Sequence, residues 1–290
     1  MSEVVNLTLN GVSEALLVTL YIRAMESQRP DALIKDEKAV ALVKKIKDEG
    51  GYDFSRIKLL HLGDENKLVI TLRCRELDRY TRDFLERHPE SVVVHIGCGL
   101  DTRFERVDNG QVEWFDLDLP EVIALRRDLM GGEKPRYHLL SCSVLEDAWL
   151  EAVKPYKERP YLFLAEGVFM YMHEDQVKSL VQTLLAHFPG AQLVFDAYSP
   201  VHVWRSNIQT AKFGVRCHWG IWRGQALEKW GSASSGGAGI RLLGEWGFFD
   251  DPTSRLDHFR WFSRIESIIR TFRIYSFQLG GIAPWEATDL

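Results

Sequence analysis

The sequence predicts an α/β protein with a doubly wound, mainly parallel sheet and a block of helices ahead of it. Two observations carry this prediction. From residue 91 onward, short apolar runs rich in β-branched and aromatic residues alternate with amphipathic helical segments, as in repeated βαβ units. The first run, at 92–96, is followed at once by the glycine pair Gly97 and Gly99, which allows the sharp turn that leaves a buried parallel strand.

The first 90 residues are predicted to be helical. Apolar residues recur at spacings of three and four in three segments, at 13–25, 36–47 and 73–88. Asp36 can cap the second segment, and Pro89 ends the third. A helical block ahead of the first strand has to pack on the sheet or over its ligand-binding edge. Its polar residues are therefore candidates for a functional site.

The remaining elements follow from the same alternation. Further strands are predicted at 112–117, 136–142, 161–165 and 191–197, and helices at 120–130 and 173–188. The first of these helices begins with Pro120 and stops at Gly131, the usual boundary residues. The chain is predicted to finish with two strands, at 241–249 and 273–281, around a helix at 255–270.

The glycine pair and an acid on the next strand predict a nucleotide-type site. Asp118 ends the second strand about 20 positions after Gly99, the spacing at which a carboxylate meets the ribose hydroxyls of a bound nucleotide. Asp116, two residues earlier, is the alternative. Thr102 stands where the dinucleotide fingerprint has its third glycine, which argues against NAD and favours a nucleoside cofactor without a pyrophosphate. S-adenosylmethionine is the commonest such cofactor; the other interpretation is a tight turn in an ordinary α/β domain.

Length and composition are those of a globular protein with one core. The chain has 290 residues and a net charge of −5, so one α/β domain with insertions is expected and a nucleic-acid partner is not. No leader pattern and no apolar run of about 18 residues occurs, which predicts a cytoplasmic protein without a membrane partner. The four cysteines are scattered without a C-x-x-C pair, which argues against a zinc site and against disulfides.

The alternation breaks at 198–244. This segment combines four tryptophans with histidines and arginines and then a glycine- and serine-rich stretch at 231–239. Such a composition favours a mobile lid over a pocket, and a packed insertion or a contact between two copies of the chain is the alternative. The residues concerned are Trp204, Trp219, Trp222, Trp230, His202, His218, Arg205, Arg216 and Arg223.

Five motifs in order resemble the leucine carboxyl methyltransferase family, in particular its bacterial branch of small-molecule, polyketide-type O-methyltransferases. They are IRAMESQRPDALIKDEKA at 22–39, LRCRELD at 72–78, HIGCGLDTRFER at 95–106, FDLDLPEVIALRR at 115–127 and LAEGVFMYM at 164–172. The resemblance implies the Rossmann-like class I methyltransferase fold in a single domain. Its parts would be a helical cap at 1–90, a cofactor-binding core at 91–197, a lid insertion after the fifth strand at 198–244, and final strands and a helix at 245–290.

The resemblance also implies roles for particular residues. Gly97 and Gly99 would lie along the methionine part of S-adenosylmethionine, and Asp118 would accept hydrogen bonds from the ribose. Arg73 would hold the cofactor carboxylate, a task that suits a planar fork of donors, and Arg23 would assist; the alternative for either arginine is a solvated helix face. Glu166 would meet the cofactor amino group. Ser143 and Val144 fall where the family usually has Asp-Leu beside adenine, a departure that weakens this contact.

The expected reaction is methyl transfer to an oxygen of a small acidic metabolite, with a carboxylate oxygen as the favoured acceptor. Methyl transfer from a sulfonium requires alignment and exclusion of water and needs no metal. A carboxylate is already ionised, whereas a phenol would benefit from a base such as His173, His202 or His218. Tyr171 is expected to face the substrate. The alternatives are methylation of a protein C-terminal carboxylate, and cofactor binding without catalysis.

Overall fold

Seven strands form one central sheet in the computed structural model, which describes residues 11–57, 63–210, 216–231, 239–258 and 271–281. The spatial order is β3-β2-β1-β4-β5-β7-β6. The first five strands pair in parallel, and β7 lies antiparallel between β5 and β6. The strands are β1 (Val92–Ile96), β2 (Glu113–Asp118), β3 (Tyr137–Ser141), β4 (Tyr161–Ala165), β5 (Gln192–Tyr198), β6 (Ile240–Gly247) and β7 (Phe272–Leu279).

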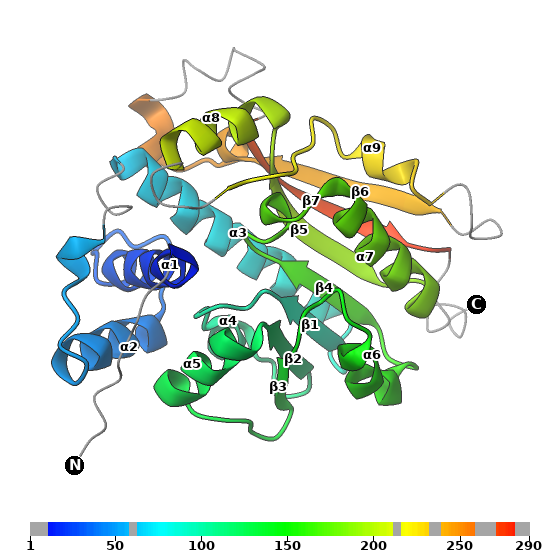
Figure 1. The fold of residues 1–290 in the computed structure, drawn as a ribbon, viewed down its shortest axis with the longest axis horizontal. Helices are drawn as coiled ribbons and strands as arrows, with labels where there is room; N and C mark the ends of the chain where they lie inside the picture. Colours follow the sequence, from blue (N-terminus) through cyan, green and yellow to red (C-terminus); the bar gives the residue numbers. More distant parts are fainter. Residues whose placement is uncertain (1–10, 58–62, 211–215, 232–238, 259–270, 282–290) are drawn as a thin grey trace.

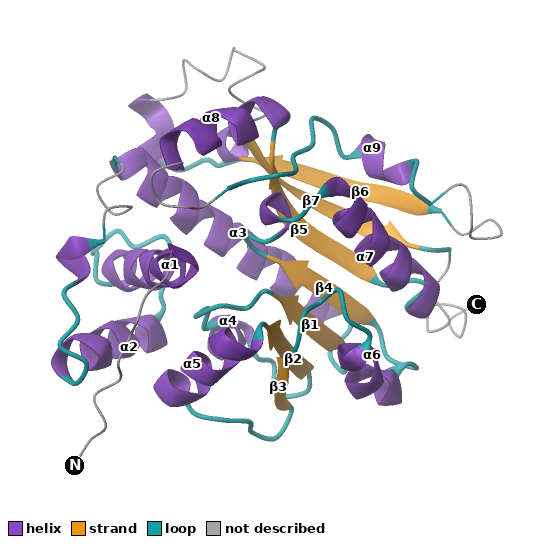
Figure 2. Cartoon of the chain, viewed as in Figure 1, coloured by secondary structure: helices purple, strands orange, loops and turns teal. Residues whose placement is uncertain are grey.

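Helices cover both faces of this sheet, as Figures 1 and 2 show. One core cluster joins the strands to α3, α4 and α5, and the other joins them to α6, α7 and the segment at 219–227. The β1 and β4 strands are buried along their whole length, which explains their continuous apolar sequences. The helices are α1 (Gly11–Ser27), α2 (Glu37–Asp48), α3 (Asp64–Arg87), α4 (Arg103–Val107), α5 (Pro120–Met130), α6 (Ala148–Val153), α7 (Glu174–His187), α8 (Pro200–Thr210) and α9 (Gln225–Glu228).

The N-terminal helices form a third cluster beside the sheet. Apolar side chains of α1 and α2 pack together with Leu100, from the turn after β1, and Leu129, from α5. Asp36 caps α2 as predicted, because its Oδ1 accepts a hydrogen bond from the Ala39 N–H at 2.9 Å. Figure 1 shows α1 and α2 (blue) on the side of the molecule where α4 and α5 lie. The helical block therefore reaches the turn that leaves β1.

Most predicted elements are confirmed, and the differences have local causes. The α3 helix begins at Asp64, nine residues before the predicted segment, because Leu68 and Leu72 add buried apolar positions at the same spacing. Most of the predicted helix at 255–270 lies outside the described residues. None of the described helices combines the length and apolar content that a membrane crossing requires.

The insertion after β5 is packed in part. Trp219, Ile221 and Leu227 belong to the core cluster on one face of the sheet, and the Trp219 ring lies 6.1 Å from that of Phe195. Asn207 of α8 holds the same segment, since its side chain makes two hydrogen bonds of 2.8 Å with the Cys217 backbone. Residues 211–215 and most of the glycine- and serine-rich stretch lie outside the described residues. Closure of a lid thus stays a prediction, and 216–231 is a packed insertion.

Asp116 is a structural residue that ties β2 to its neighbours. Its carboxylate accepts hydrogen bonds from Trp114 Nε1 at 2.8 Å, from the Tyr137 hydroxyl at 2.6 Å and from Arg126 Nη2. Burial opposes its ionisation, but Arg126 and the neighbouring His95 outweigh this and lower the pKa of Asp116 to about 2. With its oxygens engaged and buried, Asp116 is not available to a ribose, so the alternative to Asp118 is wrong.

We expect Asp116→Asn to lower the free energy of unfolding by about 3–5 kcal/mol, because it leaves the buried Arg126 guanidinium without its counter-ion. Urea unfolding followed by circular dichroism measures this loss. The folded-state pKa is depressed, so the advantage of the wild-type protein is present above pH ~4 and declines as the pH falls toward 2.

The double variant Asp116→Asn/Arg126→Met is the matched control. Removing both charges should recover part of the lost stability, since no uncompensated ion is then buried. A single variant within about 0.5 kcal/mol of wild type would show that the pair contributes little.

Candidate active site at the carboxyl edge of the sheet

Several of the predicted site residues lie close together at the edge of the sheet where β1, β2, β4 and β5 end. Because these strands are parallel, their carboxyl ends share one edge of the sheet. The turn at 97–102, Asp118, Glu166 and Asp196 come from four different strands or the turns after them. Helix α3 crosses this edge and contributes Arg73. Residues far apart in the sequence are thereby brought into direct contact.

The turn after β1 requires both of its glycines. Gly97 has φ of +65° and Gly99 has φ of +50°, a conformation that L side chains rarely adopt. A Cβ on Gly97 would lie 2.4 Å from Val168 Cγ2, and one on Gly99 would lie 2.7 Å from Leu16 Cδ2. The sequence predicted open backbone here for a ligand. The structure shows that side chains from α1 and from the turn after β4 approach the glycines as well.

Asp118 lies beside this turn, at the end of β2. Its Oδ2 accepts a hydrogen bond from the Gly99 N–H and its Oδ1 one from the Leu119 N–H, each at 2.8 Å. Unlike Asp116, it is only half-buried, and burial raises its pKa. The carboxylate therefore holds the glycine turn in place and still faces the edge of the sheet.

The next strand end carries weaker polar groups. Ser143 follows β3, and its hydroxyl accepts a hydrogen bond from the Leu145 N–H at 3.2 Å. Val144 packs against the core cluster on that face of the sheet, and its carbonyl accepts a hydrogen bond from Trp149 Nε1 at 3.0 Å. Both residues are half-buried beside β3, the position at which the sequence predicted the adenine contact.

Arg73 bridges two acids from different strands. Its Nε donates to Glu166 Oε1 at 2.9 Å, and its Nη1 donates to Asp196 Oδ2 at 3.3 Å. Asp196 Oδ1 accepts a hydrogen bond from the Gly167 N–H at 2.6 Å, and Gly167 has φ of +68°. A Cβ there would lie 3.4 Å from Arg73 Nη1, about an ordinary contact distance, so the positive φ rather than lack of space favours glycine at this position. Arg73 is buried, so the interpretation as a solvated helix face is wrong.

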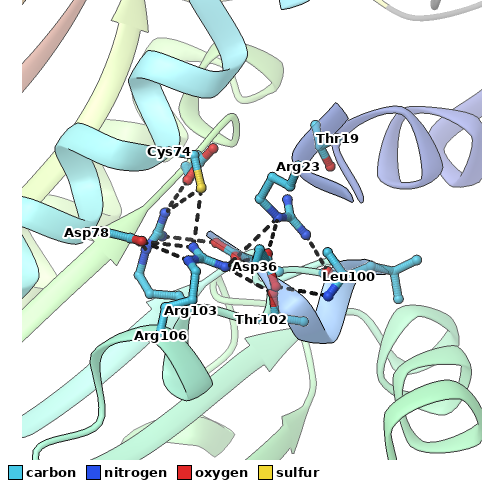
Figure 3. Close-up of polar contacts among 12 residues, drawn as sticks. Thr19, Arg23, Asp36, Cys74, Asp78, Leu100, Thr102, Arg103 and Arg106 are labelled. Atoms are coloured by element: carbon cyan, nitrogen blue, oxygen red, sulfur yellow. Dashed lines mark hydrogen bonds and ion pairs between the residues drawn. The ribbon is translucent and has the colours of Figure 1, made fainter. Parts of the chain in front are cut away.

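Arg103 and Arg106 extend this arrangement into a larger buried network (Figure 3). Arg103 donates to Asp78 Oδ1 at 2.7 Å and to Glu166 Oε2 at 2.5 Å, and its Nη1 lies 3.1 Å from Asp101 Oδ2. Arg106 donates to Asp78, Asp101, Thr102 and Asp36. Helix α3, the turn after β1, α4 and the turn after β4 are thus joined by charged groups.

Arg23 belongs to the other end of the same network. Its Nε donates to Asp36 Oδ2 at 3.0 Å, and its Nη2 donates to the Leu100 carbonyl at 2.7 Å. Asp101 Oδ1 lies 3.9 Å from Nε. Arg23 is buried, which excludes the solvated-face interpretation for it too. Its contacts fix α1 to the N-terminus of α2 and to the glycine turn.

The neighbouring arginines shift the pKa values of the buried acids and thereby favour their ionised form. Burial opposes ionisation of Glu166, but Arg73 and Arg103 outweigh it and lower its pKa. Burial also opposes the ionisation of Asp101, but Arg103 and Arg106 outweigh it and hold the pKa of Asp101 well below the usual range. Asp196 differs, because burial raises its pKa and Arg73 offsets only part of the effect. Glu166 and Asp101 are therefore carboxylates near neutral pH.

Three potential metal ligands come together in this network. The ligand atoms of Cys74, Asp101 and Glu166 lie within 4.8 Å of one another. Arg103 contacts all three, with its Nη2 also 3.8 Å from Cys74 Sγ, and Arg106 Nη2 donates to the same sulfur at 3.2 Å. The positive charge among these ligand atoms is supplied by guanidinium groups. Burial raises the pKa of the Cys74 thiol, so it is not a ready thiolate.

The two predicted catalytic residues occupy different surroundings. Tyr171 follows β4 and is 45% exposed, while burial of its hydroxyl raises the pKa of Tyr171 to about 12. His202, on α8, packs its ring 4.4 Å from that of Tyr198. Burial and the nearby Arg205 lower the pKa of His202 to about 4. The rings of the other two histidines, His173 and His218, lie 4.2 Å from each other.

Sequence reasoning missed several members of the network. Arg103, Arg106, Asp78 and Asp101 lie inside the motifs that carried the family resemblance, yet none was given a role. The i, i+3 spacing of the two arginines, which puts both on one helix face, was an available signal. Asp196 had no such signal, because a lone acid near the end of a buried strand gives no indication of its partner.

Comparison with known proteins shows the family to which this sequence is similar. Residues 15–185 match the family model described as leucine carboxyl methyltransferase. The chain is 35% identical over 260 residues to the tetracenomycin polyketide synthesis O-methyltransferase TcmP of Streptomyces glaucescens, covering 87% of this chain and 88% of that protein. It is 36% identical over 203 residues to the S-adenosyl-L-methionine-dependent methyltransferase dpfgK of Gibberella zeae, covering 66% and 67%.

Among solved structures, a duf574 family protein from Streptomyces avermitilis has a similar fold. The TM-score is 0.53 at 13% sequence identity, and the match covers 91% of this chain and 96% of that one. At this identity the likeness concerns the fold alone. The strand order and the antiparallel seventh strand are those of the class I methyltransferase fold that the sequence resemblance implied.

We expect the His202 imidazole to titrate near pH 4, below the ordinary value of 6.5, because it is partly buried beside Arg205. Two-dimensional NMR of the histidine side chains measures the midpoint, with His202→Gln identifying the signal. The folded state binds this proton less tightly than the unfolded chain does. His202 should therefore cost stability as the pH falls from 6.5 toward 4. Arg205→Gln should raise the midpoint only in part, and a wild-type midpoint near 6.5 would contradict the assignment.

Proposed function

Because the chain belongs to the leucine carboxyl methyltransferase family and is an S-adenosylmethionine-dependent methyltransferase, we propose that it methylates a carboxylate oxygen of a small-molecule metabolite. The similarity to TcmP, an O-methyltransferase of polyketide synthesis, supports an oxygen acceptor and a small molecule. We propose further that 1–290 acts as a single domain, with the N-terminal helices and the insertion after β5 on the side of the acceptor.

The charged groups at the sheet edge fit the cofactor. Its amino-acid end carries one carboxylate and one ammonium group, and the site offers a guanidinium, Arg73, next to an ionised acid, Glu166. Arg73 would hold the cofactor carboxylate and Glu166 its amino group. Asp118 would accept from the ribose hydroxyls, next to the positive-φ backbone of Gly97 and Gly99. Ser143 and Val144 would border the adenine, and Arg23 would act indirectly, through Asp36 and the Leu100 carbonyl.

One observation carries the choice of a carboxylate acceptor. At neutral pH, His202 with a pKa of about 4 is a poor proton acceptor, and Tyr171 with a pKa of about 12 stays protonated. The two candidate catalytic side chains are therefore unsuited to deprotonate a phenol or an alcohol. A carboxylate needs no deprotonation, and S-adenosylmethionine supplies a methyl group already activated on sulfur. The task left to Tyr171 and His202 is to orient the acceptor and exclude water.

The insertion after β5 suits an acidic and partly aromatic acceptor. Trp204, on α8, is 67% exposed, and Arg205 and Arg216 are exposed on the same insertion. An arginine fork can fix a carboxylate that apolar walls alone cannot orient. We propose that α8 closes over the acceptor, whereas 216–231 keeps its packed position. The exposed apolar side chains of α8, such as Trp204, would also suit a contact between two copies of the chain.

Asp118→Ala should weaken binding of S-adenosylhomocysteine by roughly 1.5–3 kcal/mol, because two ribose hydroxyls lose an ionised acceptor. Isothermal titration calorimetry measures this, with circular dichroism to verify the fold. In the wild-type protein the affinity should fall as the pH decreases through the raised pKa of Asp118, since only the ionised form accepts both bonds. The conservative variant Asp118→Asn should lose this pH dependence. An unchanged dissociation constant in Asp118→Ala would remove Asp118 from the site.

The acceptor class is tested with matched aromatic substrates that differ only in carrying a carboxylate, a phenol or an alcohol, together with a peptide ending in leucine. Transfer of a radiolabelled methyl group gives a methyl ester with a carboxylate and an ether with a hydroxyl. Only the ester releases methanol in mild base. We expect base-labile product from the small carboxylic acids and a rate that changes little between pH 6 and 8. Base-stable product would exclude the carboxylate, and preference for the peptide would indicate a protein methylase.

A further inference from the structure

We propose that Arg103 is a positioning residue for the cofactor: it fixes the Glu166 carboxylate in the orientation that receives the cofactor amino group, and it makes no cofactor contact of its own. This inference rests on the role of Glu166 in the proposed function. It concerns a residue whose contacts are all with the protein.

The surroundings of Arg103 exclude direct contact with a ligand. The residue is 0% exposed, and all three of its nitrogens face protein groups. Nε donates to Asp78 of α3, Nη1 lies 3.1 Å from Asp101 in the turn after β1, and Nη2 donates to Glu166 after β4. The planar guanidinium thus fixes three elements relative to one another. A lysine at this position would offer one point charge in place of three separated donors.

Glu166 needs a positively charged partner that does not also bind the cofactor. Its Oε1 accepts from Arg73, but Arg73 also contacts Asp196 and would contact the cofactor carboxylate. Its Oε2 accepts from Arg103 at 2.5 Å, and Arg103 has no role toward a ligand. The Arg103 contact can therefore persist when Arg73 shifts to meet the cofactor. It keeps Glu166 ionised and restricts its side chain to one orientation.

Arg106 provides a matched control. It is almost as deeply buried as Arg103 and donates to Asp78, Asp101 and Asp36 from the same short helix. No hydrogen bond or ion pair joins Arg106 to Glu166, both of which lie in the described part of the chain. A general loosening of the network should follow from loss of either arginine. A specific effect on Glu166 should follow only from loss of Arg103.

The test compares two ligands in titration calorimetry of the full-length protein. S-adenosylhomocysteine carries the amino-acid end, and 5′-methylthioadenosine lacks it. We expect Arg103→Met to weaken S-adenosylhomocysteine about tenfold or more, the scale of one hydrogen bond to a charged group, and to change 5′-methylthioadenosine less than about twofold. Arg106→Met should change both ligands by the same factor. The ratio of the two dissociation constants does not depend on the fraction of folded protein, so partial unfolding does not disguise the result. Arg103→Lys, which disturbs the fold less, should show the same ratio change at a smaller size.

Glu166→Gln separates failure of this inference from failure of the proposed site. If Glu166→Gln changes the ratio and Arg103→Met does not, the role of Arg103 is overturned and the cofactor site stands. If Glu166→Gln leaves the ratio unchanged, Glu166 does not bind the amino group, and the inference falls with that assignment. Equal ratio changes in Arg103→Met and Arg106→Met would reduce Arg103 to a structural member of the network.

Discussion

A buried network of paired carboxylates and guanidinium groups determines how the parts of this protein fit together. Taking single charges out of water is costly, so each buried ion here needs partners of opposite sign. Those partners come from different elements: α1 and α2 through Arg23 and Asp36, α3 through Arg73 and Asp78, and the strand ends through Glu166. The N-terminal helices are therefore held to the sheet edge by charge in addition to apolar packing. Removing one partner leaves the others buried and uncompensated, so the loss of a single charge is costly.

This constraint also explains where the residues that we propose for cofactor binding lie. Glu166 follows β4 and Asp196 lies near the end of β5, where the parallel strands expose their carboxyl ends, and burial alone would raise the pKa of both. Arg73 reaches them from α3 and lies beside the turn at Gly167. The site thus depends on a helix that lies before the sheet in the sequence. A Rossmann-like core without the preceding helices would lack Arg73, the positive partner that these two acids share.

Sequence reasoning predicted the sheet well and the network poorly, for physical reasons. Continuous apolar strands such as β1 and β4 are recognised because burial on both faces imposes one composition. Gly97, Gly99 and Asp118 follow from turn geometry and spacing, and Arg73 and Glu166 required the family resemblance. The choice between Asp116 and Asp118 needed the structure, since both point to the same face of β2 and only side-chain partners distinguish them. Pairings such as Arg103 with Glu166, 63 positions apart, cannot be read from local patterns.

The balance of charge in the network bears on ligand choice. Among the described residues, its buried part contains four guanidinium groups, on Arg23, Arg73, Arg103 and Arg106, and five carboxylates, on Asp36, Asp78, Asp101, Glu166 and Asp196. Arg82, whose side chain is 48% exposed, lies 3.8 Å from Asp78 at the margin of the network. The raised pKa of Asp196 shows that this last charge is the least well compensated. A sulfonium cofactor with an ammonium and a carboxylate carries one net positive charge, which complements such an excess, and transfer of the methyl group removes that charge. We therefore expect electrostatics at this edge to favour the methylated cofactor over its product.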